Sequence, residues 1–325
     1  MAMAFGPVDE RRRALLRDSP RTRSSREREG EDLMESWART GPVVVEVDGS
    51  AEGRRVVEYA CREAMRSGSG LLLAAPYQPY SLLPVSGEWQ SPADLLRTAV
   101  AQVRHLAGSH LQLDSVAVEG SRLKALAKVA RDARVLVVGR TPVRGPQRLV
   151  TAHGDIFLTA RTGCPVIVVP ATWRTSELDR QVAVGIDGTP LSLDAVEFAF
   201  RTAADRAGGL TVVHAQHAPR HGRDLSSTDE LSVSETLADW AQRFPEVKVT
   251  RFLTGRPVVE ALVQEGRQVG LVVVGAPAGL LPIGDPVVRR TVAGMSCPVA
   301  VVPHQAVDER ADTAYPFDQS LENHV

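Results

Sequence analysis

The stretch VVVEVDGSAEGRR, residues 43–55, places an acidic residue at the tip of an apolar segment. A valine-rich run of this length predicts a buried β-strand, and the glycine and serine after Asp48 predict a turn. Apolar residues then recur every three to four positions, which predicts a helix with one buried face. The stretch VAVGIDGTPLSLDA, residues 182–195, repeats the arrangement with Asp187. Open α/β sheets bind ligands at the carboxyl ends of their strands, so both aspartates are candidates for ligand contact.

The rest of the chain also reads twice through one pattern. Strand-like runs lie at 43–48, 70–76, 115–120, 134–139 and 164–170, and again at 182–187, 209–215, 248–255, 270–275 and 297–303. Helical periods separate these runs, and corresponding residues keep a nearly constant spacing between the copies. We interpret the chain as a tandem duplication with domains at 41–170 and 181–303. Residues 1–40 and 304–325 are polar and charged, so we expect disordered extensions there.

The alternation of strands and helices predicts the fold class. Strands that are apolar on both faces require helices on both sides of a parallel sheet. With right-handed crossovers, each copy becomes a five-stranded, doubly wound α/β domain of flavodoxin-like type. The closing strands, CPVIVVP at 164–170 and CPVAVVP at 297–303, are too apolar to stay exposed as sheet edges. We therefore expect them to pair with each other, which makes the two copies an internal pseudo-dimer.

Composition excludes several classes of function. The chain has 38 basic and 39 acidic residues and a formal net charge of -1, which argues against binding nucleic acid through bulk electrostatics. No apolar run reaches the roughly 18 residues of a membrane span, and the N-terminus lacks the apolar core of a signal peptide. We therefore expect a cytoplasmic protein without a membrane partner. The widely spaced Cys61, Cys164 and Cys297 predict reduced core thiols.

Both copies share four motifs in which the chain resembles the universal stress protein family. These are the VDGS or IDGT tip of the first strand, a glycine before the helix after the third, the VVG end of the fourth and the CPV-x-VVP closing strand. The match is to a tandem two-domain member. The resemblance implies an adenine nucleotide alpha hydrolase-like fold and a role in stress response. It also implies a ligand site in which the strand-one aspartate contacts adenine and ribose and a loop after strand four holds phosphates.

In the first copy this loop departs from the family's spacing of Gly, two residues, Gly, nine residues, Gly-Ser or Gly-Thr. Gly139 begins the pattern, but three residues later Pro142 lacks the N–H that a phosphate needs. His153 occupies part of the Gly-Ser position, as either a pH-sensitive ligand contact or a solvent-facing residue at a helix start. Arg140 and Arg144 could instead meet a phosphate through their side chains.

The second copy has a shorter loop after Gly275. Asp285 falls at or beside the Gly-Ser position, so a carboxylate lies where phosphate oxygens would be. Like charges about 4 Å apart repel by roughly 1 kcal/mol in water and by several times that near a protein surface. We therefore expect no triphosphate in this copy, while adenosine, AMP or another small ligand stays open for both copies. Asp285 before Pro286 also fits the cap and first turn of the last helix.

The sequence offers no catalytic constellation. A G-x-S-x-G nucleophile elbow is missing, as are the acid pair and lysine of a phosphorylatable receiver domain. His214, His217 and His221 lack the spacing of a metal site, so we predict no metal. We predict that the chain is not an enzyme.

The leading hypothesis is a regulatory protein that binds an unknown protein partner and an adenine nucleotide, ATP or AMP. The alternative is an interaction scaffold of the same fold that has lost nucleotide binding, and a homodimer of whole chains stays open. The candidate nucleotide contacts are Asp48, Gly49, Ser50, Gly139, Arg140, Arg144, His153, Asp187, Gly188, Thr189 and Gly275.

Overall fold

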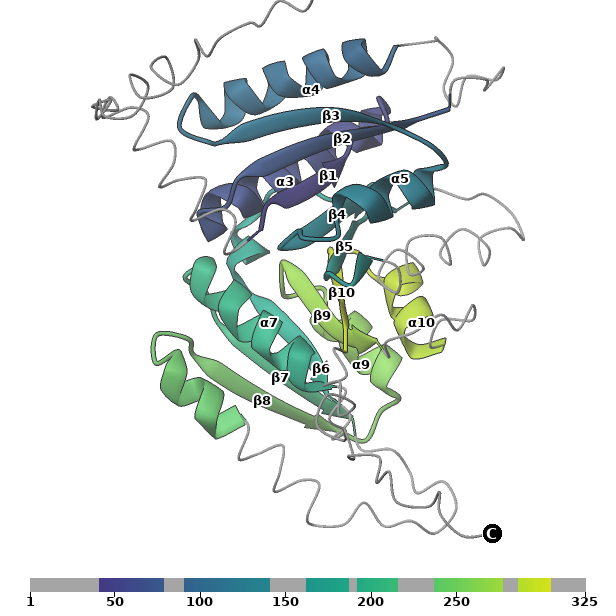
Figure 1. Ribbon diagram of the computed structural model, residues 1–325. Coiled ribbons are helices and arrows are strands. Elements are labelled where there is room, and N and C mark those ends of the chain that lie inside the picture. The colour runs from purple at the N-terminus through teal and green to yellow at the C-terminus, as the bar shows by residue number, and fades with distance from the viewer. Residues whose placement is uncertain are drawn as a thin grey trace, which may run out of the picture. The chain divides into compact units, whose positions relative to one another are not determined.

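The computed structural model describes residues 41–78, 91–140, 162–186, 192–215, 237–276 and 286–304. We call 41–170 the first half and 181–304 the second half. Strands and helices alternate through both (Figure 1).

The first half contains five strands and three described helices. In chain order they are β1 (Val43–Glu46), α3 (Ala51–Ser67), β2 (Leu71–Tyr77), α4 (Pro92–Ala107), β3 (Leu113–Glu119), α5 (Arg122–Val129), β4 (Val135–Gly139) and β5 (Val166–Val169). A short 3-10 helix, η1 (Glu177–Arg180), lies in the linker to the second half.

The second half repeats this order. Its elements are β6 (Val182–Ile186), α7 (Leu193–Asp205), β7 (Leu210–Ala215), a helix at 237–243, β8 (Val249–Thr254), α9 (Val258–Glu265), β9 (Leu271–Ala276), α10 (Pro286–Gly294) and β10 (Val299–Pro303).

All described strands belong to one 10-stranded sheet in the order β3-β2-β1-β4-β5-β10-β9-β6-β7-β8. Neighbouring strands within each half are parallel, and each half has the doubly wound order with β1 or β6 at its centre. The closing strands β5 and β10 pair antiparallel, with Ile167 opposite Ala300. This confirms the predicted α/β fold and the internal pseudo-dimer.

Buried side chains on the two faces of the sheet form two separate clusters. Along β1, Val43 and Val45 belong to the cluster under α3, α4 and α7, whereas Val44 belongs to the cluster under α5, α9 and α10. This explains why the strand is apolar at successive positions, because both of its faces are covered. Each fully buried valine of this kind contributes about 1.5 kcal/mol or more to folding.

Candidate functional site

Asp48 lies two residues beyond the end of β1, where the backbone turns into α3. Val47 is still buried, but Asp48 and Gly49 are exposed, and Gly49 has a φ of 75° that suits glycine. The Ser50 N–H and hydroxyl donate to the Asp48 carboxylate at 2.9 and 2.8 Å. The Ser50 oxygen accepts a hydrogen bond from the Gly53 N–H at 2.8 Å and so caps α3. The aspartate therefore stabilises the turn while its carboxylate stays at the surface.

Gly53 allows this carboxylate to lie close against the first turn of α3. A Cβ atom at Gly53 would collide with Asp48 Oδ1 and would lie 3.1 Å from Ser50 Oγ. A larger residue would therefore displace the carboxylate from its present position. When the two halves are aligned on Asp48 and Asp187, the residue that corresponds to Gly53 is Ser192.

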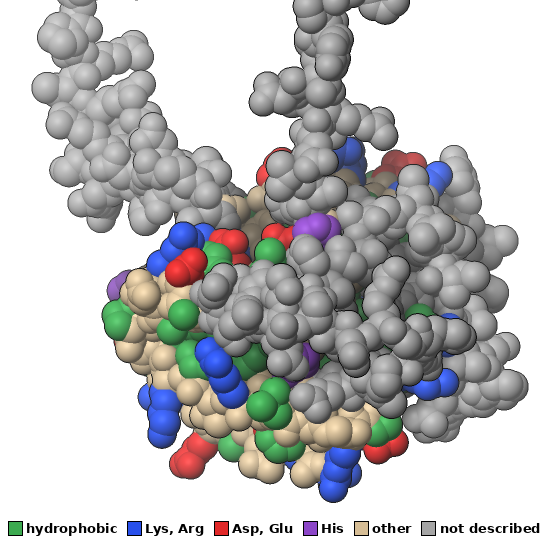
Figure 2. Space-filling view, turned by 90° about the horizontal axis from the view of Figure 1, so that it is seen from below, with side chains coloured by type: hydrophobic (Ala, Val, Ile, Leu, Met, Phe, Trp, Pro, Cys, Tyr) green, Lys and Arg blue, Asp and Glu red, His purple; other side chains and the backbone are tan. Residues whose placement is uncertain are grey.

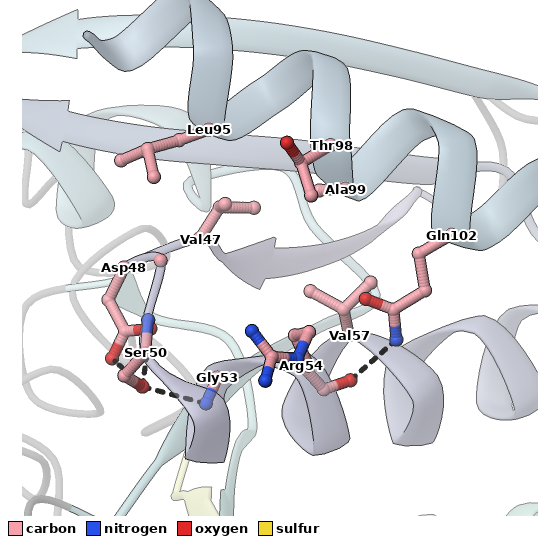
Figure 3. Close-up of a pocket in the computed structure, with 11 residues that line it drawn as sticks. Val47, Asp48, Ser50, Gly53, Arg54, Val57, Leu95, Thr98, Ala99 and Gln102 are labelled. Carbon is pink, nitrogen blue, oxygen red and sulfur yellow. Dashed lines mark hydrogen bonds between the residues drawn. The ribbon is translucent and has the colours of Figure 1, made fainter. Parts of the chain in front are cut away.

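A pocket of about 80 Å³ opens beside the turn, between the end of β1, α3 and α4 (Figure 3). Its lining residues are Val47, Asp48, Gly49, Ser50, Gly53, Arg54, Val57, Leu95, Thr98, Ala99 and Gln102. Val47, Val57 and Ala99 are buried apolar walls, whereas Asp48 and Thr98 are exposed at the rim. Apolar walls with a few polar groups are typical of small-ligand sites, but such sites usually measure roughly 300 Å³ or more. The described walls therefore enclose only part of a nucleotide-sized ligand.

The position of α4 over this pocket depends on its cap and on one hydrogen bond to α3. The Asp94 N–H donates to Ser91 Oγ at 3.2 Å, and the Ser91 hydroxyl donates back to the Asp94 carboxylate at 2.7 Å. The hydrogen bonds from Ser91 and then from Arg97 lower the pKa of Asp94. Gln102 Nε2 donates to the Arg54 carbonyl at 2.7 Å, as Figure 3 shows. The two helices are thus joined at the rear of the pocket.

The rim combines one acid and one base. The Arg54 guanidinium is exposed and has no hydrogen-bond or ion-pair partner within the described part of the chain. The single Ser50 hydroxyl proton lies within reach of both Asp48 oxygens, at 2.8 and 3.0 Å, and satisfies one of them at a time. The carboxylate therefore keeps free acceptor capacity. A ligand that offers hydroxyl or amine donors and an acceptor would find a partner for each at this rim.

Gly139 and Arg140 lie at the start of the predicted phosphate loop. A Cβ atom at Gly139 would lie 3.1 Å from a Val56 methyl group, so the glycine permits close packing of β4 on α3. Arg140 reaches the second half, where its Nη1 donates to the carbonyls of Val292 and Met295 at 2.9 and 2.8 Å. These carbonyls lie at the end of α10, so the Arg140 guanidinium caps a helix C-terminus in the other half.

The other predicted contacts are only partly described. Gly275 belongs to β9 and pairs with Val302 of β10. Outside the described residues lie Arg144, His153, Asp187, Gly188 and Thr189. Of the predicted residues, the structure therefore brings Asp48, Gly49 and Ser50 together at the pocket.

Aromatic side chains of the second half pack between α7 and the helix at 237–243. The helix at 237–243 corresponds to α4 in the order of elements, and Trp240 takes the place of Ala99. Phe200, Trp240 and Phe244 pack against one another, with ring centroids 6.0 to 6.4 Å apart. The three rings thus join α7 to the helix at 237–243.

The two halves also differ where the first helix meets the residue after the closing strand. In the first half, Arg55 Nη1 donates to the Ala171 carbonyl at 2.7 Å. In the second half, Asp194 Oδ2 lies 2.7 Å from His304 Nδ1. His304 is the first residue of the predicted C-terminal extension, and it is held by this contact.

Sequence reasoning missed the α4 side of the pocket. Leu95, Thr98 and Gln102 recur at spacings of three and four and therefore share one helix face. The same periodicity is typical of residues that only pack against a core, and no polar motif marks these positions. The signal was present, but it did not separate a pocket wall from a core contact.

Surface charge and the remaining groups add little further chemistry. On the face that Figure 2 shows, the described Lys and Arg side chains stand apart among acidic, apolar and neutral ones. No described helix is long and apolar enough to span a membrane. The described residues also contain no group of three or more His, Cys, Asp or Glu side chains arranged to hold a metal ion.

The fold and the site together define a class of protein. It is a tandem, doubly wound α/β protein with a pocket beside Asp48, the aspartate that follows the first strand of the first half. The family model of the universal stress protein family matches residues 40–170 and 180–303. The chain belongs to this family and carries two of its domains in tandem, as the sequence motifs predicted.

Individual relatives agree with this assignment. Universal stress protein Rv2005c of Mycobacterium tuberculosis is 28% identical over 254 residues, which cover 72% of this chain and 86% of the relative. Universal stress protein Rv2623 of the same organism is 26% identical over 296 residues, covering 82% and 97%. The crystal structure of a universal stress protein from Archaeoglobus fulgidus gives a TM-score of 0.62 at 15% identity, covering 82% of this chain and 100% of that chain. At this identity the likeness to the solved structure concerns the fold alone.

Proposed function

We propose that this chain is a regulatory universal stress protein of the cytoplasm whose first half binds an adenine nucleotide, AMP or ATP, without chemical turnover. The observation that carries the proposal is the position of Asp48 at the rim of the pocket between α3 and α4. The carboxylate keeps acceptor capacity beside apolar walls. An adenosine group combines a flat apolar base with amine and hydroxyl donors, and so matches both features.

The phosphates of such a ligand would extend toward the residues after β4. Strands β1 and β4 are parallel neighbours, so the segments that follow them begin at the same edge of the sheet. Arg144 and His153 are the proposed contacts there. Arg140 would join them only by leaving the carbonyls of α10. This cost favours a ligand with few phosphates, such as AMP, over ATP.

We assign the stronger site to the first half. Its pocket contains Gly53 and Ala99, whereas the second half has Ser192 and Trp240 at the corresponding positions. The second half also carries Asp285 at its loop, which would repel phosphate oxygens. Weaker contacts in that half are proposed for Asp187, Gly188, Thr189 and Gly275.

Calorimetric titration of the full chain with AMP, ATP and cyclic AMP tests the proposal, together with mass spectrometry of an acid extract. We expect heat of binding with AMP and a loss of affinity of about tenfold or more in Asp48→Ala, the amount that about 1.4 kcal/mol represents. Asp187→Ala is the matched control and should bind nearly as the wild type does. The reverse order of the two variants would move the site to the second half.

A second candidate function is an interaction scaffold without a nucleotide. Two observations favour it: the pocket walls enclose only about 80 Å³, and the Arg140 guanidinium is engaged by carbonyls of the second half. Absence of heat with all three nucleotides up to millimolar concentration, and no nucleotide in the extract, would support the scaffold. An unknown protein partner is part of both candidates.

A further inference from the structure

A buried ionic cluster joins the two halves on the face of the sheet covered by α3 and α7. The Arg206 side chain, at the end of α7, is 0% exposed, and that of Glu63 in α3 is 4% exposed. Arg206 Nη2 donates to Glu63 Oε2 at 2.9 Å and to the Tyr59 hydroxyl oxygen at 2.7 Å. Arg206 Nη1 donates to the Asp179 carbonyl of the linker at 2.8 Å. A cation of the second half is therefore enclosed by the first half and the linker.

The cluster holds its charge but leaves polar atoms without partners. Burial alone would lower the pKa of Arg206, but Glu63 and Tyr59 raise it, so the guanidinium stays charged. Arg206 Nε and Asp179 Oδ2 are buried without a hydrogen-bond partner in the described part of the chain. Arg66 Nη2 lies 3.7 Å from Asp179 Oδ2. A buried pair that leaves such atoms unsatisfied gives little net stability compared with apolar side chains of similar size.

The pseudo-symmetry of the chain shows what else the cluster can do. We align the two halves on Asp48 and Asp187, the aspartates that follow their first strands. In this alignment Tyr59 corresponds to Phe198, Glu63 to Thr202 and Ser67 to Arg206. At these positions the first half has the anion without the cation, and the second half has the cation without the anion. The ion pair therefore forms only between unlike halves.

We infer that this cluster makes the α3–α7 surface specific for pairing a first half with a second half. Two second halves joined through it would bury two Arg206 guanidinium groups against Thr202 and Phe198. Two first halves would bury two Glu63 carboxylates against Ser67. An unpaired buried charge is far more costly than a buried pair, so both like-with-like pairings are disfavoured.

One position earlier the signs are reversed, because Arg66 of the first half corresponds to Asp205 of the second, but each of these side chains has another ion-pair partner. Arg66 lies against Asp179 of the linker. Asp205 forms an ion pair with Arg134 of the first half at 2.5 Å, which is again a contact between unlike halves. Both charges are thus already engaged around the cluster.

On the opposite face of the sheet, another contact between the halves also lacks a symmetry-equivalent contact. Arg140 of the first half caps α10 of the second. The residue of the second half that corresponds to Arg140 is Ala276, which follows Gly275. Its methyl side chain cannot make the equivalent contact with the first half. The two arginines, one from each half, therefore make the pseudo-dimer an unlike pair on both faces of the sheet. The partner that fits the α3 surface is the second half of the chain and not another first half.

Hydrogen exchange of the full chain tests whether the cluster acts at this interface. The variant Arg206→Ser gives the second half the serine that the first half has at the corresponding position, Ser67. In this variant we expect amides of β5 and β10 to exchange on the order of 100-fold faster than in the wild type. Amides of β1, β2, β6 and β7 should change by less than about tenfold. The control is Arg201→Ser, which removes an exposed pair with Glu197 in the same helix and should leave all strands unchanged. A uniform increase over all strands in Arg206→Ser would overturn the inference.

A refolding experiment tests specificity directly. The double variant Ser67→Arg, Thr202→Glu supplies both charges to both halves and so permits like-with-like pairing. Isotopically labelled and unlabelled full chains are unfolded in urea, refolded together and analysed by native mass spectrometry. We expect the double variant to give several-fold more mixed oligomers than the wild type. An equal fraction of mixed oligomers in both proteins would show that the cluster does not select the partner.

Discussion

At the scale of single residues, Asp48 combines a structural task with a proposed ligand contact. The sequence left these as alternatives: the acid holds an adenine ring or ribose, or it caps the turn into the first helix. The structure shows the turn, because the Ser50 N–H and hydroxyl both bond to Asp48 Oδ1. The second carboxylate oxygen retains acceptor capacity at the pocket rim. The two roles therefore do not exclude each other.

Gly53 provides a test that separates ligand binding from stability. In Gly53→Ala the new methyl group would displace the Asp48 carboxylate from Ser50. The lost hydrogen bonds cost about 1 kcal/mol, but alanine in a helix gains about 0.8 kcal/mol over glycine. We expect the urea midpoint to change little and the affinity for AMP to fall about tenfold or more in calorimetry.

The control for this variant is Glu52→Ala, one position earlier. Among the described residues, the ion-pair partner of Glu52 is Arg55, at 4.0 Å, and Glu52 does not line the pocket. Its removal should leave the affinity for AMP unchanged. Unchanged affinity in Gly53→Ala as well would mean that the position of the Asp48 carboxylate does not matter for the ligand.

At the scale of elements, the end of α10 depends on a side chain from the other half. Arg140 donates to two carbonyls there, and charge-assisted hydrogen bonds of this kind contribute about 1.5 to 3 kcal/mol. We expect Arg140→Ala to lower the free energy of unfolding in urea by about that amount and to speed amide exchange in α10. Arg290→Ala removes an exposed arginine of the same helix and should change neither. Faster exchange confined to β4 would contradict the capping role.

Elements were also the scale at which the sequence predicted best. The apolar runs at 43–45 and 182–184 identify strands covered on both faces, because three successive residues in each run are apolar. The pairing of β5 with β10 followed from the cost of an exposed apolar edge. The contact of Arg140 with α10 did not follow, since a long side chain can reach many groups and only the packed halves decide which. The pocket wall at Thr98 was missed because its helix periodicity also fits a simple core contact.

At the scale of the whole molecule, the two halves share a fold and differ where chemistry would occur. Ala99 lines a pocket, whereas Trp240, at the corresponding position of the helix at 237–243, packs against Phe200. Glu63 and Arg206 complete each other across the interface. Duplication thus supplied one scaffold twice, and we propose that substitutions at a few positions give the first copy its ligand site and make the interface specific for unlike halves.

The three cysteines predict how the stability of the whole molecule depends on pH. Burial raises the pKa of Cys61 and Cys164 to about 11 and that of Cys297 to about 12. In the unfolded chain the pKa of a thiol is about 8.5. Between these values the folded protein binds more protons than the unfolded chain, so stability must fall as pH rises. Below about pH 7 the thiols contribute almost no slope, since they are protonated in both states.

Urea unfolding measured from about pH 7 to about pH 10.5 checks this expectation. At about pH 7 thiol titration should not affect the free energy of unfolding. At higher pH this free energy should decrease, by at most about 1.4 kcal/mol per pH unit for each thiol. The triple variant Cys61→Ala, Cys164→Ala, Cys297→Ala will start from a lower stability because buried volume is lost. Its decrease above about pH 9 should be clearly shallower. A slope as steep as that of the wild type would assign the alkaline loss to other groups, Tyr59 first among them, since burial raises the pKa of its hydroxyl as well.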